Sequence, residues 1–123
     1  IQVVATSLLI LFGVRTQIVY IGDIVNIIIT FIWVLGITNA FNHLDIIDGL
    51  AISIAVIISF AFFIISFLTG DIMTAILSLA LSGAGLSFLI YNLPPAKVYM
   101  GNTGSHFLGF VLAAVALIIS MPL

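Results

Sequence analysis

Residues 50–91 read LAISIAVIISFAFFIISFLTGDIMTAILSLALSGAGLSFLIY, two long apolar runs separated by the short polar segment Thr69-Gly70-Asp71. Each run approaches the roughly 20 residues that an α-helix needs to cross the hydrocarbon core of a bilayer. The sequence therefore predicts two spans, Leu50 to Leu68 and Ile72 to Tyr91, that form an antiparallel hairpin around a tight turn. The segment Gly83-Ala84-Gly85 in the second run is expected to let another helix pack closely.

The composition of the whole chain requires lipid as its solvent. Of 123 residues, 64% are hydrophobic and 5% are charged, whereas about a quarter of the residues of a soluble domain are charged. Two basic and four acidic residues cannot cover the exterior of a soluble protein. Backbone groups in lipid must be paired internally, and the apolar runs are continuous rather than alternating, so we expect helices and not a β-barrel.

Polar residues divide the rest of the chain into further candidate spans, which are Ile24 to Phe41, Phe107 to Met121 and the shorter Val3 to Phe12. The predicted fold class is therefore all-α, a polytopic integral membrane helical bundle with four to five transmembrane helices in a single domain over residues 1–123. Both ends of the sequence fall in apolar runs, without an initiator Met or a basic leader. We expect the chain to be an internal fragment of a larger multi-span protein.

The hairpin predicts that two polar loops lie at the same membrane surface. Its free ends lead to residues 42–48 and 94–105, which contain two of the four acidic residues and the only lysine. The positive-inside rule does not set the orientation, because Lys97 lies on this side and Arg15 is expected on the other.

The first polar loop contains Asn42, Asp45 and Asp48, which recur every three residues. In a helix these side chains would project from nearly one face. An amide and two carboxylates can coordinate a hard cation or accept hydrogen bonds from a ligand. For Asp48 alone, capping of the next helix is an equal alternative. For the three residues together we favour a function, because ionisable groups at membrane depth are costly.

The second polar loop lies within residues 91–105, YNLPPAKVYMGNTGS. Its two prolines end the preceding helix, and two glycines flank Asn102-Thr103 in a turn whose backbone N–H groups can face an anion. Thr103 or Ser105 would then cap the next helix, whose N-terminus suits a phosphate group. An ordinary interhelical loop with a cap is the alternative, and this loop taken alone favours it.

Net charge and the content of cysteine, histidine and lysine limit the kinds of ligand that the chain can bind. A net charge of −2 without a basic run argues against nucleic-acid binding, and the absence of cysteine excludes disulfides and thiolate metal sites. His43 and His106 are not spaced as a metal pair, and Lys97 either binds phosphate or marks the membrane edge. Carboxylates, amides, one cation and a helix N-terminus together suit phosphoryl transfer, where catalysis is mostly positioning and charge neutralisation.

Two motifs in this order resemble those of a known family. Residues 37–50, ITNAFNHLDIIDGL, are similar to the N-A-x-N-x-x-D-G-x-D-G-L signature of the polyprenyl-phosphate N-acetylhexosamine-1-phosphate transferases, the MraY/WecA superfamily (glycosyl transferase family 4). Residues 95–105, PAKVYMGNTGS, resemble the later P-A-x-x-F-M-G-D-x-G-S loop of that family. The resemblance extends from about Asp23 onward. The amino-acid sequence at residues 32–39 and 104–110 is more similar to the WecA-like branch than to the MraY branch.

The resemblance implies an enzyme with two phosphorylated substrates. In this family a polyprenyl phosphate, usually undecaprenyl phosphate, attacks the sugar-linked phosphorus of a UDP-N-acetylhexosamine and releases UMP, assisted by Mg²⁺ (or Mn²⁺). The product initiates lipid-linked glycan synthesis for the cell wall or for surface polysaccharide. The resemblance also implies a protein integral to the cell inner (cytoplasmic) membrane, surrounded by membrane lipid, with its polar loops facing the cytoplasm. It leaves open whether the protein forms a homodimer.

The resemblance also implies a role for each motif residue by position. Asp45 and Asp48 would be catalytic, and Asn102 and Asn42 would be metal ligands. The substrate-binding residues would be Asn39, Asn42, Asp45, Asp48, Lys97, Gly104 and Ser105.

Three departures from the family pattern affect these expectations. Asn102 stands where the family has a metal-binding Asp, and an amide offsets less of the charge of the cation than a carboxylate does. Ile46 stands where the family has a glycine, which reduces the freedom of the backbone. An earlier Asp-Asp pair and a later His-rich loop of the family are absent, as we expect for an internal fragment. We expect this segment alone to be inactive.

Two other functions stay open at this point. In a secondary transporter or ion pathway, Asp45 and Asp48 would bind a coupling ion and lie near the bilayer midplane, between spans. In a non-catalytic membrane scaffold the site would be degenerate, and Asn102 is the best support for that reading. The position of the two acids relative to the helices separates the transporter from the transferase.

Overall fold

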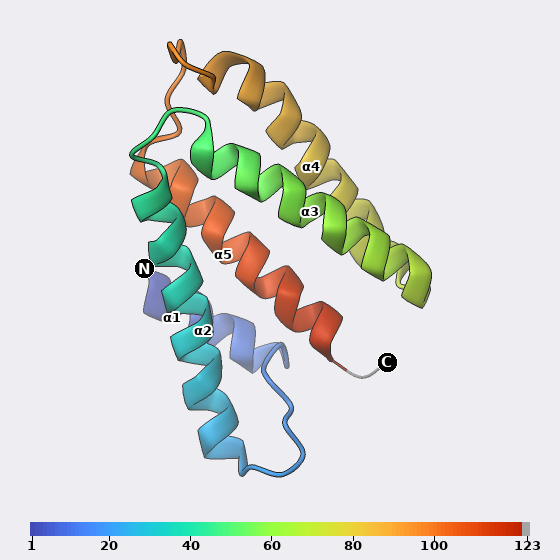
Figure 1. Cartoon of the computed structure of the whole chain (residues 1–123). Coiled ribbons are helices and arrows are strands. Elements are labelled where there is room, and N and C mark those ends of the chain that lie inside the picture. The colour runs from blue at the N-terminus through green and yellow to red at the C-terminus, as the bar shows by residue number, and fades with distance from the viewer. Residues whose placement is uncertain (122–123) are drawn as a thin grey trace.

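The computed structural model describes residues 1–121, which form five α-helices (Figure 1). The helices are α1 (Gln2–Leu11), α2 (Asp23–Leu44), α3 (Leu50–Thr69), α4 (Ile72–Asn92) and α5 (Gly101–Ser120). In the described part of the chain, α2 to α5 have 20 to 22 residues each and are apolar enough to cross a membrane. At 1.5 Å per residue, such a helix is about 30 Å long. The predicted all-α bundle of membrane spans is confirmed.

Helix α5 differs most from its predicted boundaries. It begins at Gly101, well before the expected Phe107, because the segment GNTG continues the helix where a turn was expected. Helix α2 also continues past the expected Phe41, to Leu44. Both differences turn residues of the polar motifs into helical residues.

Helices α3 and α4 form the predicted antiparallel hairpin. Gly70 ends α3 with φ 83°, a left-handed conformation that glycine adopts without steric cost. Asp71 caps α4 by accepting a hydrogen bond from the N–H of Thr74 at 3.1 Å. Helix α5 packs between this hairpin and α2 (Figure 1). The end of α2, the start of α3, the end of α4 and the start of α5 therefore lie at one end of the bundle, called the site face below.

The buried surfaces of the bundle consist largely of small and hydroxyl-bearing residues. On α3 and α4 the buried polar residues include Ser59, Ser66, Thr74, Ser78 and Ser82, each at most 5% exposed. Large apolar side chains point outward instead, such as Ile57 at 69% and Leu68 at 78% exposure. Membrane helices associate through small residues that let their backbones approach, because lipid is as apolar as leucine. The outer surface of the bundle is therefore suited to lipid.

Two glycines set the closest approaches between helices. A Cβ added to Gly109 of α5 would lie 2.8 Å from the Cα of Thr38 on α2. A Cβ added to Gly85 of α4 would lie 2.7 Å from the Cγ2 of Val56 on α3. The packing role expected for Gly83-Ala84-Gly85 is confirmed at Gly85, whereas Gly83 faces open space.

Candidate functional site

Two loops form the site face. The first loop comprises residues 45–49, between α2 and α3, and the second loop comprises residues 93–100, between α4 and α5. They lie at the same end of the bundle (Figure 1), as the sequence predicts. In direct contact, Oδ2 of Asp48 in the first loop accepts a hydrogen bond from the backbone N–H of Ala96 in the second loop at 3.2 Å. Two helices, α3 and α4, separate these residues in the sequence.

Asn92, the last residue of α4, fastens the two loops to each other. Its side chain is 3% exposed. Its Oδ1 accepts the N–H of Gly49 at 3.0 Å, and its Nδ2 donates to the carbonyl of Val98 at 2.9 Å. The sequence analysis did not assign a role to Asn92. The available signal was an amide at the end of an apolar helix, directly before Leu-Pro-Pro.

Gly49 has a backbone conformation that favours glycine. Its φ is 78°, in the left-handed region where side chains are disfavoured. Glycine at this position lets the chain turn from Asp48 into α3 while its N–H reaches Asn92.

The residues of the first motif do not share one helical face. Asn42 lies in the last turn of α2, Asp45 is the C-cap of that helix, and Asp48 lies in the first loop. The expected common face is therefore wrong, because α2 ends at Leu44. The loop nevertheless keeps the two acids near each other, as their electrostatics show.

The predicted cap of α5 by Thr103 or Ser105 is wrong. Met100 is the N-cap of α5, without a side-chain cap, and Thr103 and Ser105 lie inside the helix because it starts before them. Capping of α3 by Asp48, the equal alternative, does not occur either. Gly49 is the N-cap of α3 without a side-chain cap, and Asp48 binds the second loop.

Partial burial raises the pKa of Asp45 above its usual value of 3.8, and the negative charge of Asp48 is a second, smaller cause. The negative charge of Asp48 therefore disfavours the ionised form of Asp45. A bound cation would offset this effect, because positive charge favours the ionised form of a carboxyl group.

Ser105 joins the second motif to the first. Its side chain is fully buried, and its Oγ lies 3.0 Å from Oδ1 of Asn42, to which it can donate. The same Oγ lies 3.1 Å and 3.2 Å from the backbone carbonyls of Gly101 and Asn102. The hydroxyl has one hydrogen to donate, and donation to Asn42 leaves that amide oxygen one further lone pair. The structure thus brings Asn42, a predicted metal ligand and substrate-binding residue, into contact with Ser105, a predicted substrate-binding residue.

Asn102 is exposed on the first turn of α5 and lines a hollow of about 710 Å³ between α1, α2 and α5. The polar part of its lining is Gln2, Thr38, Asn102, Thr103 and His106, and the apolar part includes Ile1, Val3, Phe107 and Phe110. A hollow of this size, mostly apolar with a few polar groups, is typical of a small-molecule site. It adjoins the site face at the predicted metal ligand.

The other predicted residues are spread around the site face. Lys97 is exposed in the second loop, Gly104 lies near the start of α5, and Asn39 is exposed near the end of α2. The Nδ2 of Asn39 donates to the carbonyl of Leu35 at 2.7 Å. Within residues 1–121, no ion pair joins Lys97 to an acid of the first loop.

The donors present fit a cation that is shared with a ligand. Within the described residues, no three His, Cys, Asp or Glu side chains lie close enough together to hold a metal ion by themselves. Mg²⁺ is commonly bound through one or two carboxylates, and water and substrate phosphates complete its octahedral shell. Asp45 and Asp48 match this mode, because they are two carboxylates on one short loop. They do not match a closed metal cage.

The position of the acids argues against an ion pathway. Asp45 and Asp48 follow the end of α2 and precede the start of α3. A coupling-ion site of a transporter lies near the bilayer midplane, between interrupted helices. The acids of the first loop lie at the end of the spans instead.

Replacing Asn92 tests the junction between the loops. Asn92→Ala should lower the free energy of unfolding by about 1–3 kcal/mol, because the buried N–H of Gly49 would be left without a partner. Asn92→Asp keeps an acceptor for Gly49 but places a carboxylate oxygen against the carbonyl of Val98, so it should not restore the stability. The control Asn102→Ala removes an exposed amide and should change stability by less than about 0.5 kcal/mol. Equal unfolding curves for the Asn92→Ala and Asn102→Ala variants of the purified protein would contradict the junction.

The raised pKa of Asp45 predicts a pH dependence of stability. The native state holds the Asp45 proton more tightly than the unfolded chain, so the free energy of unfolding should fall as pH rises from 3.8 through the raised pKa. Asp45→Asn should remove this fall in metal-free buffer.

Asp71→Asn is the matched control, with the opposite sign. Hydrogen bonds from Thr74 lower the pKa of Asp71 below 3.8, so its contribution is present above that value and is lost as pH falls through the lowered pKa. Unfolding titrations of both variants at a series of pH values check the pair. An Asp45→Asn variant that keeps the parental pH slope would refute the raised pKa of Asp45.

Comparison with known proteins identifies relatives of this arrangement. The family described as glycosyl transferase family 4 matches residues 1–120. The chain is 52% identical to the phospho-N-acetylmuramoyl-pentapeptide-transferase of Clostridium botulinum (strain Eklund 17B / Type B) over 86 residues, which are 70% of this chain and 26% of the relative. It is 51% identical to the protein of the same name from Clostridium perfringens (strain 13 / Type A) over 88 residues, 72% of this chain and 28% of the relative.

A third relative carries a different name. The probable undecaprenyl-phosphate N-acetylglucosaminyl 1-phosphate transferase of Bacillus subtilis (strain 168) is 40% identical over 90 residues, 73% of this chain and 25% of the relative. The chain thus spans about a quarter of the length of the curated relatives that it matches. These identities do not confirm the predicted WecA-like branch. They do confirm the predicted superfamily, and the chain belongs to glycosyl transferase family 4.

Proposed function

We propose that the protein containing this chain transfers N-acetylhexosamine-1-phosphate from a UDP-sugar to polyprenyl (undecaprenyl) phosphate and releases UMP. The relatives are named as transferases of phosphorylated N-acetylhexosamines. The observation that carries the proposal is the meeting of the two family motifs on the site face. The contacts are the hydrogen bonds from Ala96 to Asp48 and from Ser105 to Asn42.

The chemistry of the site face suits two phosphorylated reactants. Asp45 and Asp48 would hold Mg²⁺ (or Mn²⁺), with further oxygen ligands from Asn42, Asn102 and the substrate phosphates. The bound cation would offset negative charge on the transferred phosphoryl group. Asn92 would keep the first loop against the second, so that the acids stay in place beside the start of α5. The protein contributes mainly positioning, which is the main requirement of phosphoryl transfer.

The location of the site face suits one soluble and one lipid substrate. The chain is an integral membrane protein, and its polar loops lie at the ends of the spans, where a lipid phosphate group lies. We propose that this face is on the cytoplasmic side of the inner membrane, where a UDP-sugar is available. The hollow beside Asn102 has a mostly apolar lining with a few polar side chains, so it suits a part of a substrate that has both apolar and polar groups. The product would be a lipid-linked sugar for cell-wall or surface glycans.

Two donors are candidates, and different observations favour them. Higher identity to the clostridial relatives favours a UDP-linked N-acetylmuramoyl-pentapeptide. The resemblance of residues 32–39 and 104–110 to the WecA-like branch favours UDP-N-acetylglucosamine. Both are UDP-N-acetylhexosamines, so the proposed reaction is the same.

An activity assay with both donors tests the function. The full-length protein should release UMP from one of the two UDP-sugars when undecaprenyl phosphate and Mg²⁺ are present. Asp48→Asn should reduce the rate by about 100-fold or more, because a residue that holds the metal and the loop junction is altered. The control Gln17→Ala lies in the loop at the other end of the bundle and should keep the parental rate. Absence of UMP release with both donors, from the native protein and from its Asn102→Asp form, would refute the transferase.

Asn102→Asp tests the metal ligand at the start of α5. A carboxylate offsets more of the cation's charge than an amide does, so the variant should need less Mg²⁺ for its half-maximal rate, by about tenfold. The matched control is Thr103→Asp, which adds the same charge one position along the helix and should leave the Mg²⁺ requirement unchanged. Identical Mg²⁺ titrations for Asn102→Asp and the native protein would show that position 102 does not bind the metal.

A further inference from the structure

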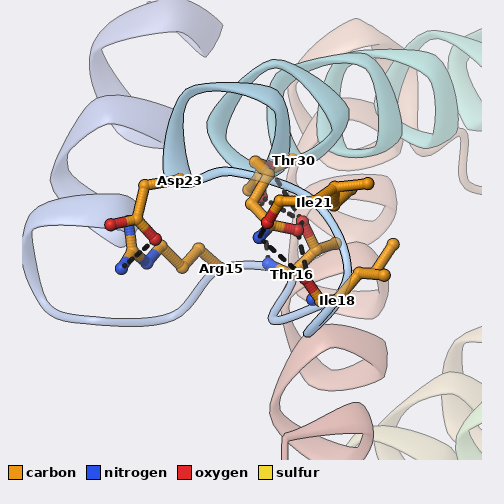
Figure 2. A network of polar contacts seen from close by, with 7 residues as sticks. Arg15, Thr16, Ile18, Ile21, Asp23 and Thr30 are labelled. Atoms are coloured by element: carbon orange, nitrogen blue, oxygen red, sulfur yellow. Dashed lines mark hydrogen bonds and ion pairs between the residues drawn. The ribbon is translucent and has the colours of Figure 1, made fainter.

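The segment between α1 and α2, residues 12–22, runs beside the first turns of α2 at the end of the bundle away from the site face (Figure 1). The backbone N–H of Thr16 donates to Oγ1 of Thr30 at 3.0 Å, and Oγ1 of Thr16 donates to the carbonyl of Asn26 at 2.8 Å (Figure 2). Thr30 lies about 10 Å along α2 from Asp23, at 1.5 Å per residue. An irregular segment therefore begins alongside α2 and not beyond its end.

A single buried side chain satisfies the polar groups at the tip of this segment. Asn26 is 5% exposed. Its Oδ1 accepts the N–H of Ile18 at 3.1 Å, and its Nδ2 lies 3.3 Å from the carbonyls of both Ile18 and Ile21. A loop in water does not need such internal partners, because solvent supplies them. At membrane depth, irregular backbone is tolerated only when protein groups replace the solvent.

The same tip directs apolar side chains outward. Ile18 is 46% exposed, Val19 is 91% exposed and Tyr20 is 97% exposed. This surface continues into α2, where Ile24 is 75% exposed. Tyrosine is enriched where a membrane meets water, because its ring is apolar and its hydroxyl is polar.

A charged pair marks the level of the membrane edge beside the tip. Arg15 and Asp23 form an ion pair at 3.2 Å (Figure 2), and the side chain of Asp23 is 78% exposed. An exposed carboxylate at the first residue of α2 belongs in the headgroup region or in water. The tip residues, next to it in the sequence, are therefore at the depth of the lipid interface.

We propose that residues 18–20 are a membrane anchor that inserts Val19 and Tyr20 into the boundary between headgroups and acyl chains, in the leaflet opposite the site face. Lipid is the occupant that fits, because the tip continues the outward apolar surface of α2 and its backbone is already paired by Asn26. Asn26 and Thr16 hold the shape of the segment, and the anchor fixes the depth of α2, whose other end carries Asn42.

Spin labels measure this insertion directly, since the 123 residues contain no cysteine. Val19→Cys and Tyr20→Cys would be labelled in the full-length protein, freed of any other cysteine and reconstituted in vesicles of phosphatidylcholine and phosphatidylglycerol. Thr69→Cys is the control, an exposed polar position at the last residue of α3 and at the same end of the bundle. All three positions are exposed, so labelling should not disturb the packing.

The labels at positions 19 and 20 should collide more often with oxygen, which dissolves in lipid, than with a water-soluble nickel chelate. The label at position 69 should show the reverse preference. Nickel accessibility at positions 19 and 20 equal to that at position 69 would overturn the anchor. Protection of both positions from both reagents would overturn it too, because protein and not lipid would then cover the tip.

Discussion

A backbone in lipid has no water to bond with, and this constraint determines most of the architecture. It makes the four long segments helical and keeps the connection between α3 and α4 to a capped glycine turn. It also explains the interior of the bundle, where serine, threonine, alanine and glycine are buried and leucine and isoleucine point outward. Irregular backbone occurs in the two loops of the site face and in the segment of residues 12–22 beside the start of α2. There, Asn92 and Asn26 supply the partners that solvent does not.

An asparagine side chain binds irregular backbone at each end of the bundle, but the two contacts have different results. At the site face, Asn92 joins two loops that are far apart in the sequence, Asp48 adds a second bond between these loops, and Ser105 links α5 to α2. At the other end, Asn26 closes a loop on itself and leaves an apolar tip outside. The first arrangement gathers polar groups for a ligand. The second leaves a largely apolar tip, with the hydroxyl of Tyr20, for the lipid interface.

The features that depend on composition and local length could be predicted from the sequence. The hairpin followed from Thr69-Gly70-Asp71 between two apolar runs, and the shared face of the loops followed from the hairpin. The start of α5 could not be predicted, because glycine and asparagine are poor helix formers, and the contact of Ser105 with Asn42 on α2 is remote in the sequence. The partners of Asp48 and Asn92 are remote in the sequence, so no local pattern indicated them. The family motifs named the site residues, and only the fold showed which of them meet.

The central claim is that the first and second loops form one ligand site. Hydrogen exchange of the full-length protein, with and without a UDP-N-acetylhexosamine and Mg²⁺, measures both loops in one experiment. The account predicts that the ligands slow exchange together in residues 45–52 and 96–105, while residues 13–22 at the other end of the bundle keep their rates. Slower exchange in only one of the two loops, or in neither of them, would contradict the account.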